Sequence, residues 1–433
     1  MAMDGKELVE KLAKLSQVQS IKDIPQLTHA LFPGTHCPLM GAAMAVGGIK
    51  DSLIVVVGTD ECTYYTKSMT IHSEKFGGID GRCVSVVLDD HDVTFGSAEK
   101  VQEAFKEIIE EYRPQCVFLV TTCVIEIIGD DFDAISEGLS KLYGIPVLPV
   151  HTEHFKCEDH LPGLERTITV CAEMMKSCDC ENSVNLLGQR MGDFATTELY
   201  AMLQKAGVKI GVQLPCGCSV DDIKNAAAAK VNIVVNDIAL PLAQKMQEKF
   251  GIPYVYFNKF VIPEKIYEAY KNLFVYLDLE LPGELEGLYQ NAREKIEKNK
   301  GELEGITYIY GNTPYAVFEM NCFLSSLGMV PQVIQTNRYT EADEPYAKEI
   351  LQYTDPYVCK AANIAPLQYV YDVLSPYLYL GHEFGNRLRQ KGIAIVDSDR
   401  ASGMLGFEVT GYLLQQLVKS VREAKEYRKE LGL

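Results

Sequence analysis

The stretch that decides the fold is VVVGTDEC, residues Val55–Cys62, in which three valines run into a glycine and a cysteine follows. A short β-branched run that ends at glycine is typical of a strand buried on both faces of a parallel sheet. Ligands of open parallel sheets bind outside the carboxyl ends of the strands. The stretch therefore predicts a parallel α/β sheet with a thiol at its functional edge.

The same alternation of strand and helix continues along the chain and restarts twice. Repeated strand–helix–strand patterns indicate parallel sheets, so we expect three similar α/β units. The predicted strands lie at residues 52–58, 83–88, 116–120, 145–150, 185–188, 208–214, 232–235, 306–311 and 330–335. The predicted divisions are an N-terminal helical segment at 1–30 and α/β domains at 31–184, 185–300 and 301–433.

Composition excludes several classes of protein. The 433 residues carry a net charge of -18 and no extended basic run, which argues against nucleic acid and anionic membranes as partners. No signal peptide and no apolar run long enough to cross a bilayer are visible. Thirteen cysteines in such a chain indicate a reducing cytoplasm, where metal ligation or catalysis is favoured over disulfides.

Three cysteines stand in related positions. Cys62 and Cys123 each follow a predicted strand of the first unit, so both should face one crevice, and Cys37 opens a helix whose positive end favours a thiolate. Iron–sulfur clusters are bound by thiolates, so the set predicts such a site. The alternative is three buried free cysteines. No CxxC pair is present, which leaves a zinc ribbon or a ferredoxin-like run unsupported.

These motifs resemble component 1 of nitrogenase and its relatives, which include dark-operative protochlorophyllide reductases and nickel-sirohydrochlorin reductive cyclases. The match is carried by CPLMGA at residues 37–42, GTDEC at 58–62 and TTCVIEIIGDD at 121–131, with weaker similarity that extends to GFE at 406–408. The closest likeness is to the beta-type subunit. The resemblance implies three Rossmann-like domains with parallel sheets around a central cleft.

The resemblance also implies a two-subunit core and an iron–sulfur cluster held by Cys37, Cys62 and Cys123 near the subunit interface. A homodimer would contribute six cysteines, the number for an eight-iron P-cluster-like centre, whereas two separate four-iron clusters would each lack one ligand. A paralogous subunit is the other possible partner. Cys157 falls near a position where family members can supply an extra ligand, and its alternative is an ordinary surface-loop cysteine.

The chain departs from nitrogenase at the iron–molybdenum cofactor, which one cysteine and one histidine hold in that family. The matching segments, residues 232–237 and 402–405, contain neither. Reduction of dinitrogen by this chain alone is therefore not expected, although an alpha-type partner could hold that cofactor.

Weaker candidates lie elsewhere. Cys216 and Cys218, in PCGC after the strand at 208–214, are expected to face the cleft, where they could bind a second metallocofactor or form a redox pair; the alternative is a tight loop that tolerates them. His382 could act as an acid or simply begin a helix. His151, His154 and His160 share a loop with acidic neighbours, which favours a solvated loop over a metal site.

The resemblance implies the catalytic component of a reductase. Such a component takes low-potential electrons from a separate ATP-dependent, nitrogenase-type iron protein through the interface cluster and reduces a substrate in the cleft. The chain has no G-x-x-x-x-G-K-[ST] motif, so nucleotide should bind the iron protein and not this chain. Two alternatives remain open: a scaffold for assembly of a metallocluster, or one subunit of a hetero-oligomeric complex.

Overall fold

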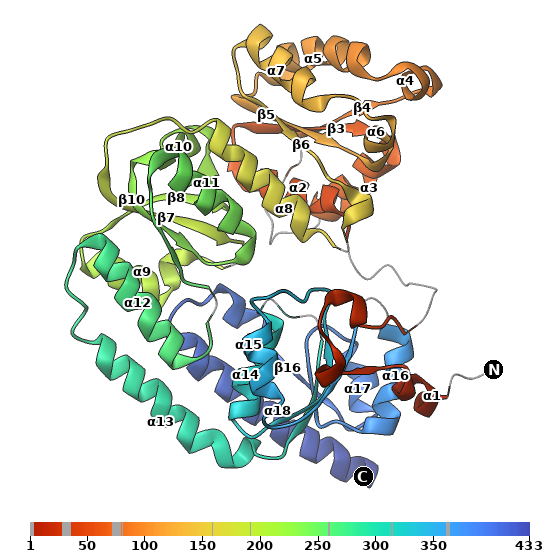
Figure 1. Ribbon diagram of the computed structural model, residues 1–433, viewed down its shortest axis with the longest axis vertical. Coiled ribbons are helices and arrows are strands. Elements are labelled where there is room, and N and C mark those ends of the chain that lie inside the picture. The colour runs from red at the N-terminus through yellow and green to blue at the C-terminus, as the bar shows by residue number, and fades with distance from the viewer. Residues whose placement is uncertain are drawn as a thin grey trace.

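The structure is a computed structural model that describes residues 4–27, 36–71, 79, 81–157, 159–190, 192–258, 260–311, 313, 315–360 and 364–433. It has three lobes, each built on a parallel sheet with its own helices (Figure 1). The predicted α/β fold with parallel sheets is confirmed. None of the helices in these residues is long and apolar enough to cross a membrane.

The first unit is built on the strand that contains the three valines. All seven residues of β3 (Ser52–Gly58) are buried, because parallel neighbours flank the strand and helices cover the sheet. The sheet has the order β4-β3-β5-β6, and its other strands are β4 (Cys83–Val87), β5 (Cys116–Thr121) and β6 (Val147–Val150). Its helices are α2 (Pro38–Gly47), α3 (Asp60–Ile71), α4 (Asp90–Phe95), α5 (Ala98–Tyr112), α6 (Cys123–Ile128), α7 (Phe132–Tyr143) and α8 (Leu161–Val170).

The second unit has a four-stranded sheet in the order β11-β10-β7-β8. Its strands are β7 (Glu181–Gln189), β8 (Lys209–Pro215), β10 (Ala229–Val234) and β11 (Tyr254–Tyr256). Its helices are α9 (Glu198–Lys205), α10 (Val220–Lys224), α11 (Leu240–Phe250), α12 (Pro263–Leu277) and α13 (Leu285–Leu303). The first and second units share one hydrophobic core, and the boundary predicted at residues 184 and 185 falls inside β7.

The third unit includes the N-terminal segment, which the sequence had placed apart. β1 (Ala13–Lys14) pairs antiparallel with β14, and α1 (Gly5–Glu10) packs on α16. The sheet order is β1-β14-β13-β12-β15-β16, with β12 (Thr307–Tyr310), β13 (Val330–Gln335), β14 (Tyr357–Cys359), β15 (Leu378–Leu380) and β16 (Ala394–Val396). The helices are α14 (Val317–Ser326), α15 (Glu344–Ile350), α16 (Ile364–Leu374), α17 (Gly385–Arg389) and α18 (Glu408–Leu431).

Helices α2 and α8 touch backbone to backbone, and this contact positions Cys37. A Cβ atom added to Gly163 would lie 1.8 Å from the carbonyl oxygen of Pro38, and one added to Gly41 would lie 1.9 Å from that of His160. Neither carbonyl can move without bending its helix. The two glycines therefore fix the start of α2 against α8.

We expect Gly163→Ala to destabilise the protein by about 1–3 kcal/mol, because the new methyl group overpacks a backbone contact. The measurement is the midpoint of thermal unfolding, which should fall. Gly138→Ala is the matched control: this helical glycine of α7 is exposed and a Cβ there meets nothing within 4 Å, so the change should stabilise slightly. Equal midpoints for the two variants would contradict the packing argument.

Candidate metal centre and its surroundings

The structure brings Cys37, Cys62 and Cys123 to one edge of the first sheet. Cys62 lies in the first turn of α3 after β3, and Cys123 opens α6 after β5, the neighbouring strand. Cys37 is the N-cap of α2, and its side chain makes no capping hydrogen bond. Burial raises the pKa of the Cys123 thiol, and the Cys62 and Cys37 thiols raise it further. The Cys62 and Cys37 sulfur atoms thus lie close enough to influence the charge of Cys123.

This donor set fits an iron–sulfur cluster. Thiolates gathered in a half-buried place repel one another, and no cationic side chain is among the described groups that shift the pKa of Cys123. A bound metal would relieve that repulsion. The Thr59 hydroxyl donates to the Cys62 sulfur at 3.6 Å, a contact that orients this side chain. Binding of a cluster by these residues remains a prediction.

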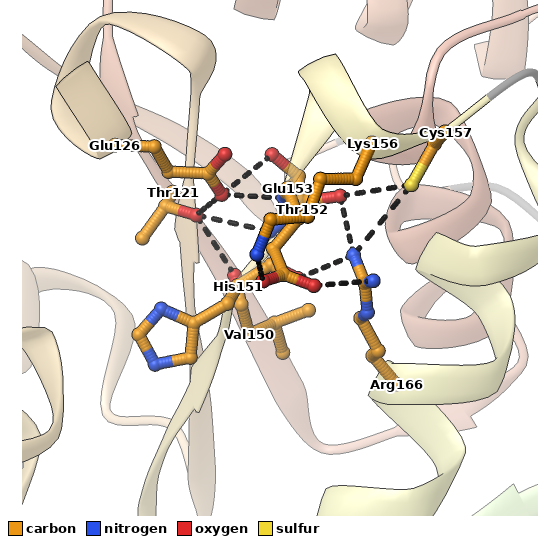
Figure 2. A network of polar contacts seen from close by, with 9 residues as sticks. All are labelled: Thr121, Glu126, Val150, His151, Thr152, Glu153, Lys156, Cys157 and Arg166. Carbon is orange, nitrogen blue, oxygen red and sulfur yellow. Dashed lines mark hydrogen bonds and ion pairs between the residues drawn. The ribbon is translucent and has the colours of Figure 1, made fainter.

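A carboxylate that the sequence analysis missed anchors α6 next to Cys123 (Figure 2). Oε1 of Glu126 accepts three hydrogen bonds: from the Thr121 hydroxyl at 2.7 Å, the Thr152 hydroxyl at 3.1 Å and the Glu153 backbone N–H at 2.6 Å. The network joins α6 to the end of β6, where the adjoining pocket has a volume of about 340 Å³. The only signal in the sequence was a glutamate inside an apolar run.

Arg166 of α8 holds the segment that carries Cys157. Its guanidinium donates to the carbonyl oxygen of Thr152 at 2.6 Å and to Glu153 Oε2 at 2.5 Å, and it lies 3.8 Å from the sulfur of Cys157. The Cys157 thiol donates to the Thr152 carbonyl at 3.6 Å. Its described contacts are with this loop and not with the three thiols. The structure therefore does not bring Cys157 into the group as a fourth ligand.

The three histidines of this region lie in different surroundings. His151 lies 3.3 Å from Asp133 Oδ1, and His154 is exposed. His160 is partly enclosed at the start of α8, where burial, aided by Arg190, lowers its pKa to about 4. The solvated loop favoured by the sequence describes His154 and not His160, which burial encloses.

The two thiols of the PCGC segment do not both face a cleft. Cys218 is only 1% exposed and belongs to β9 (Cys218–Ser219), which pairs with β2 (Ile49–Lys50) in the seam between the first two units. Burial raises its pKa to about 12. The prediction is therefore wrong for Cys218, because the chain after β8 turns back onto the end of α2. Cys216 is half-buried, and its thiol donates to the Arg190 carbonyl at 3.5 Å.

His382 is not an enclosed acid. Its side chain is 69% exposed, and Nε2 lies 3.4 Å from Asp399 Oδ1 on the surface of the third unit. Helix α17 begins nearby at Gly385. His382 precedes this helix, whose N-cap is Phe384, so neither of the two roles considered for His382 is confirmed.

Charged side chains from all three units meet at one junction, which the sequence analysis also missed. Asp237 follows β10 and influences the pKa of Glu165 in the first unit and of Glu319 and Asp343 in the third. Burial raises the pKa of all three of these carboxyl groups. The junction is therefore rich in carboxyl groups. Asp237 itself lies in the segment, residues 232–237, that matches the cysteine region of nitrogenase.

Comparison with known proteins gives one family. Residues 37–422 match the family described as nitrogenase component 1 type oxidoreductase. The nitrogenase iron-molybdenum cofactor biosynthesis protein NifE of Clostridium pasteurianum is 30% identical over 224 residues, which are 51% of this chain and 49% of that protein. The NifE of Rippkaea orientalis is 25% identical over 73% of this chain and 69% of its own length.

The nitrogenase molybdenum-iron protein alpha chain of Methanosarcina barkeri is 24% identical over 72% of this chain and 62% of its own length. The chain spans about half the length of the Clostridium NifE. A solved structure, nitrogenase Cp1 at pH 6.5, superimposes with a TM-score of 0.78 at 15% identity and covers 94% of this chain and 96% of its own. That likeness shows a shared fold. These relatives give no support to the beta-type likeness inferred from the motifs.

We expect Glu126→Ala to cost about 1–3 kcal/mol, because two hydroxyls and a backbone N–H lose their common acceptor. The thermal midpoint should fall, and protease cleavage near α6 should become faster. Glu137→Ala on the exposed face of α7, where the side chain pairs with Lys141 alone among the described residues, is the control and should leave both readouts unchanged. An unaltered midpoint in Glu126→Ala would show that the network does not hold α6.

Proposed function

The chain belongs to the nitrogenase component 1 type oxidoreductase family, and from this premise we propose that it is the catalytic component of a nitrogenase-like reductase. In this proposal it receives low-potential electrons from an ATP-dependent iron protein and reduces a substrate between its units. The observation that carries the proposal is the meeting of three thiols at one sheet edge. A bound iron–sulfur cluster supplies one-electron redox chemistry.

The residues of this chain have separate tasks in the proposal. Cys37, Cys62 and Cys123 hold the cluster, whether it has four irons or eight. Glu126 fixes the helix that begins with Cys123, and the glycine contact of α2 with α8 fixes Cys37. Three ligands leave at least one corner of a cluster open, so a partner chain, either a second copy or a paralogous subunit, completes the site.

The surface beside the thiols supports such a partner. Five large apolar side chains on α3, α4, α6 and the 3-10 helix at residues 154–156 are between 67% and 76% exposed. Helix α4 contacts α6, and both lie with α3 on one side of the first lobe (Figure 1). Exposed apolar groups gathered around a site mark an interaction surface. These residues, called the thiol-edge patch below, are Tyr64, Tyr65, Phe95, Ile127 and Phe155.

The first prediction from this proposal concerns iron. Protein expressed alone under anaerobic conditions should contain iron and sulfide, and Cys37→Ser, Cys62→Ser and Cys123→Ser should each lose or rearrange the cluster, as measured by iron quantitation and electron paramagnetic resonance. Cys157→Ser is the matched control and should keep it, because Arg166 and a carbonyl hold that thiol. Iron retained in all three variants would show that these cysteines do not bind the cluster.

The second prediction concerns assembly. Ile127→Asp places a charge in the thiol-edge patch and should raise the dissociation constant of the dimer, or of the complex with a paralogous subunit, by at least about tenfold, since burying an unpaired charge is costly. Analytical ultracentrifugation measures the change. Val275→Asp on α12 is the control, because Val275 is 76% exposed and Ile127 is 72% exposed. Equal dissociation constants for the two variants would show that the thiol-edge patch is not part of the interface.

A scaffold for metallocluster assembly is the second candidate function. Two observations favour it: two of the compared relatives are named as cofactor biosynthesis proteins, and the segment that ends in Asp237 offers no thiolate to hold a finished cofactor. One assay distinguishes the two functions. A reductase consumes electrons from an iron protein and forms a reduced product, whereas a scaffold releases its cluster to an acceptor protein without net reduction of a substrate.

A further inference from the structure

Glu319 is a buried carboxyl group with an unused oxygen. It lies in the first turn of α14 and is only 7% exposed. Oε2 accepts from the Tyr346 hydroxyl at 3.4 Å and lies 3.4 Å from Lys265 Nζ, but Oε1 is buried and has no hydrogen-bond partner among the described residues. A buried polar atom without a partner is costly, so a group outside this chain would satisfy it.

The unused oxygen lies where the second and third units meet. Lys265 belongs to α12 of the second unit, and its Nζ lies 4.1 Å from the centre of the Tyr346 ring. Tyr256 of β11 donates to Asp237, and Asn258 donates to the Tyr256 oxygen at 2.6 Å. Burial raises the pKa of Tyr256, and both Asp237 and Glu319 raise it further. The hydrogen-bonded group formed by Tyr256, Asp237 and Asn258 in the second unit therefore faces Glu319.

Burial favours the protonated form of Glu319. Burial raises its pKa, Lys265 lowers it, and Asp237 raises it again. The groups that face it are Lys265 from α12, Tyr346 from α15, Asp237 from the 3-10 helix after β10 and Tyr256 from β11. Cys322 lies one turn further along α14, and Glu349 of α15 interacts with it. When Glu319 is protonated, an O–H group at Oε1 has no acceptor in the described chain.

We propose that Glu319 is a proton donor to a substrate bound between the second and third units. The idea rests on the proposed reductive function. An unsaturated bond X=Y takes up two electrons, delivered from the iron protein, and two protons, and becomes HX–YH. Glu319 supplies one proton: its O–H bond breaks, a bond to X forms, and the carboxylate left beside Lys265 is reprotonated from water, which also supplies the second proton. The substrate class is a reducible group that accepts a hydrogen bond.

The test is an infrared pH titration of the purified chain, which follows the C=O stretch of protonated carboxyl groups. The wild type should show absorbance that titrates above the ordinary range of carboxyl groups, to which Glu165, Glu198, Asp343 and Glu383 also contribute because burial raises their pKa values. Glu319→Gln should abolish one component of this absorbance, the Glu319 band. Glu344→Gln is the matched control on α15, because the Glu344 side chain is 44% exposed and lies 3.2 Å from Lys348 Nζ; it should keep the band. Circular dichroism verifies that each variant folds.

Two further variants locate the group without touching it. Lys265→Met removes the nearby cation that favours the charged carboxylate, so the midpoint of the band should move to higher pH. Asp237→Asn removes a negative charge, so the midpoint should move to lower pH. A midpoint in the ordinary range of glutamate, or one that neither variant moves, would overturn the proposal. The titration needs no iron and no electron donor, so its failure is distinguishable from failure of the reductase function.

Discussion

The parallel pairing of β3 with β5 is the contact on which the thiol site depends. Six residues of β3 pair in register with the whole of β5, and every side chain in both strands is buried. Two strands that end side by side must release their chains at the same edge of the sheet. Cys62 and Cys123 are 61 positions apart in sequence, but this register brings both to that edge.

The elements that could be predicted from sequence are those in which local pattern and tertiary environment agree. β3 at residues 52–58 and β13 at 330–335 have the expected bounds, because each contains adjacent buried β-branched residues and ends at a glycine or a polar residue. The last helix was expected near residues 405–429 and is observed at Glu408–Leu431. The rule on strand ends correctly indicated where the chain leaves β3 and β5, since it depends on topology alone.

The same rule failed at PCGC for a physical reason. Cys218 follows β8, but the chain turns back there and pairs with the residues after α2, so the next strand begins before any side chain reaches a cleft. The polar groups around Glu126, Arg166 and Glu319 were missed because their surroundings are formed by residues from other elements. The sequence near each residue does not show whether its hydrogen bonds are made. A glutamate in an amphipathic or apolar run has no periodic signal that separates a buried carboxylate from an exposed one.

The chain keeps two kinds of chemistry apart. Thiols lie at the exposed edge of the first sheet, where soft ligands suit iron and a partner can close the site. Carboxyl groups lie at the junction of the three units, where burial and mutual repulsion favour their protonated forms. Reduction needs electrons and protons in equal number, and they can arrive by different routes. A soft site at a sheet edge and an acidic site at the junction of the units would provide this division, so the absence of a cysteine at residues 232–237 is compatible with the proposed reductive chemistry.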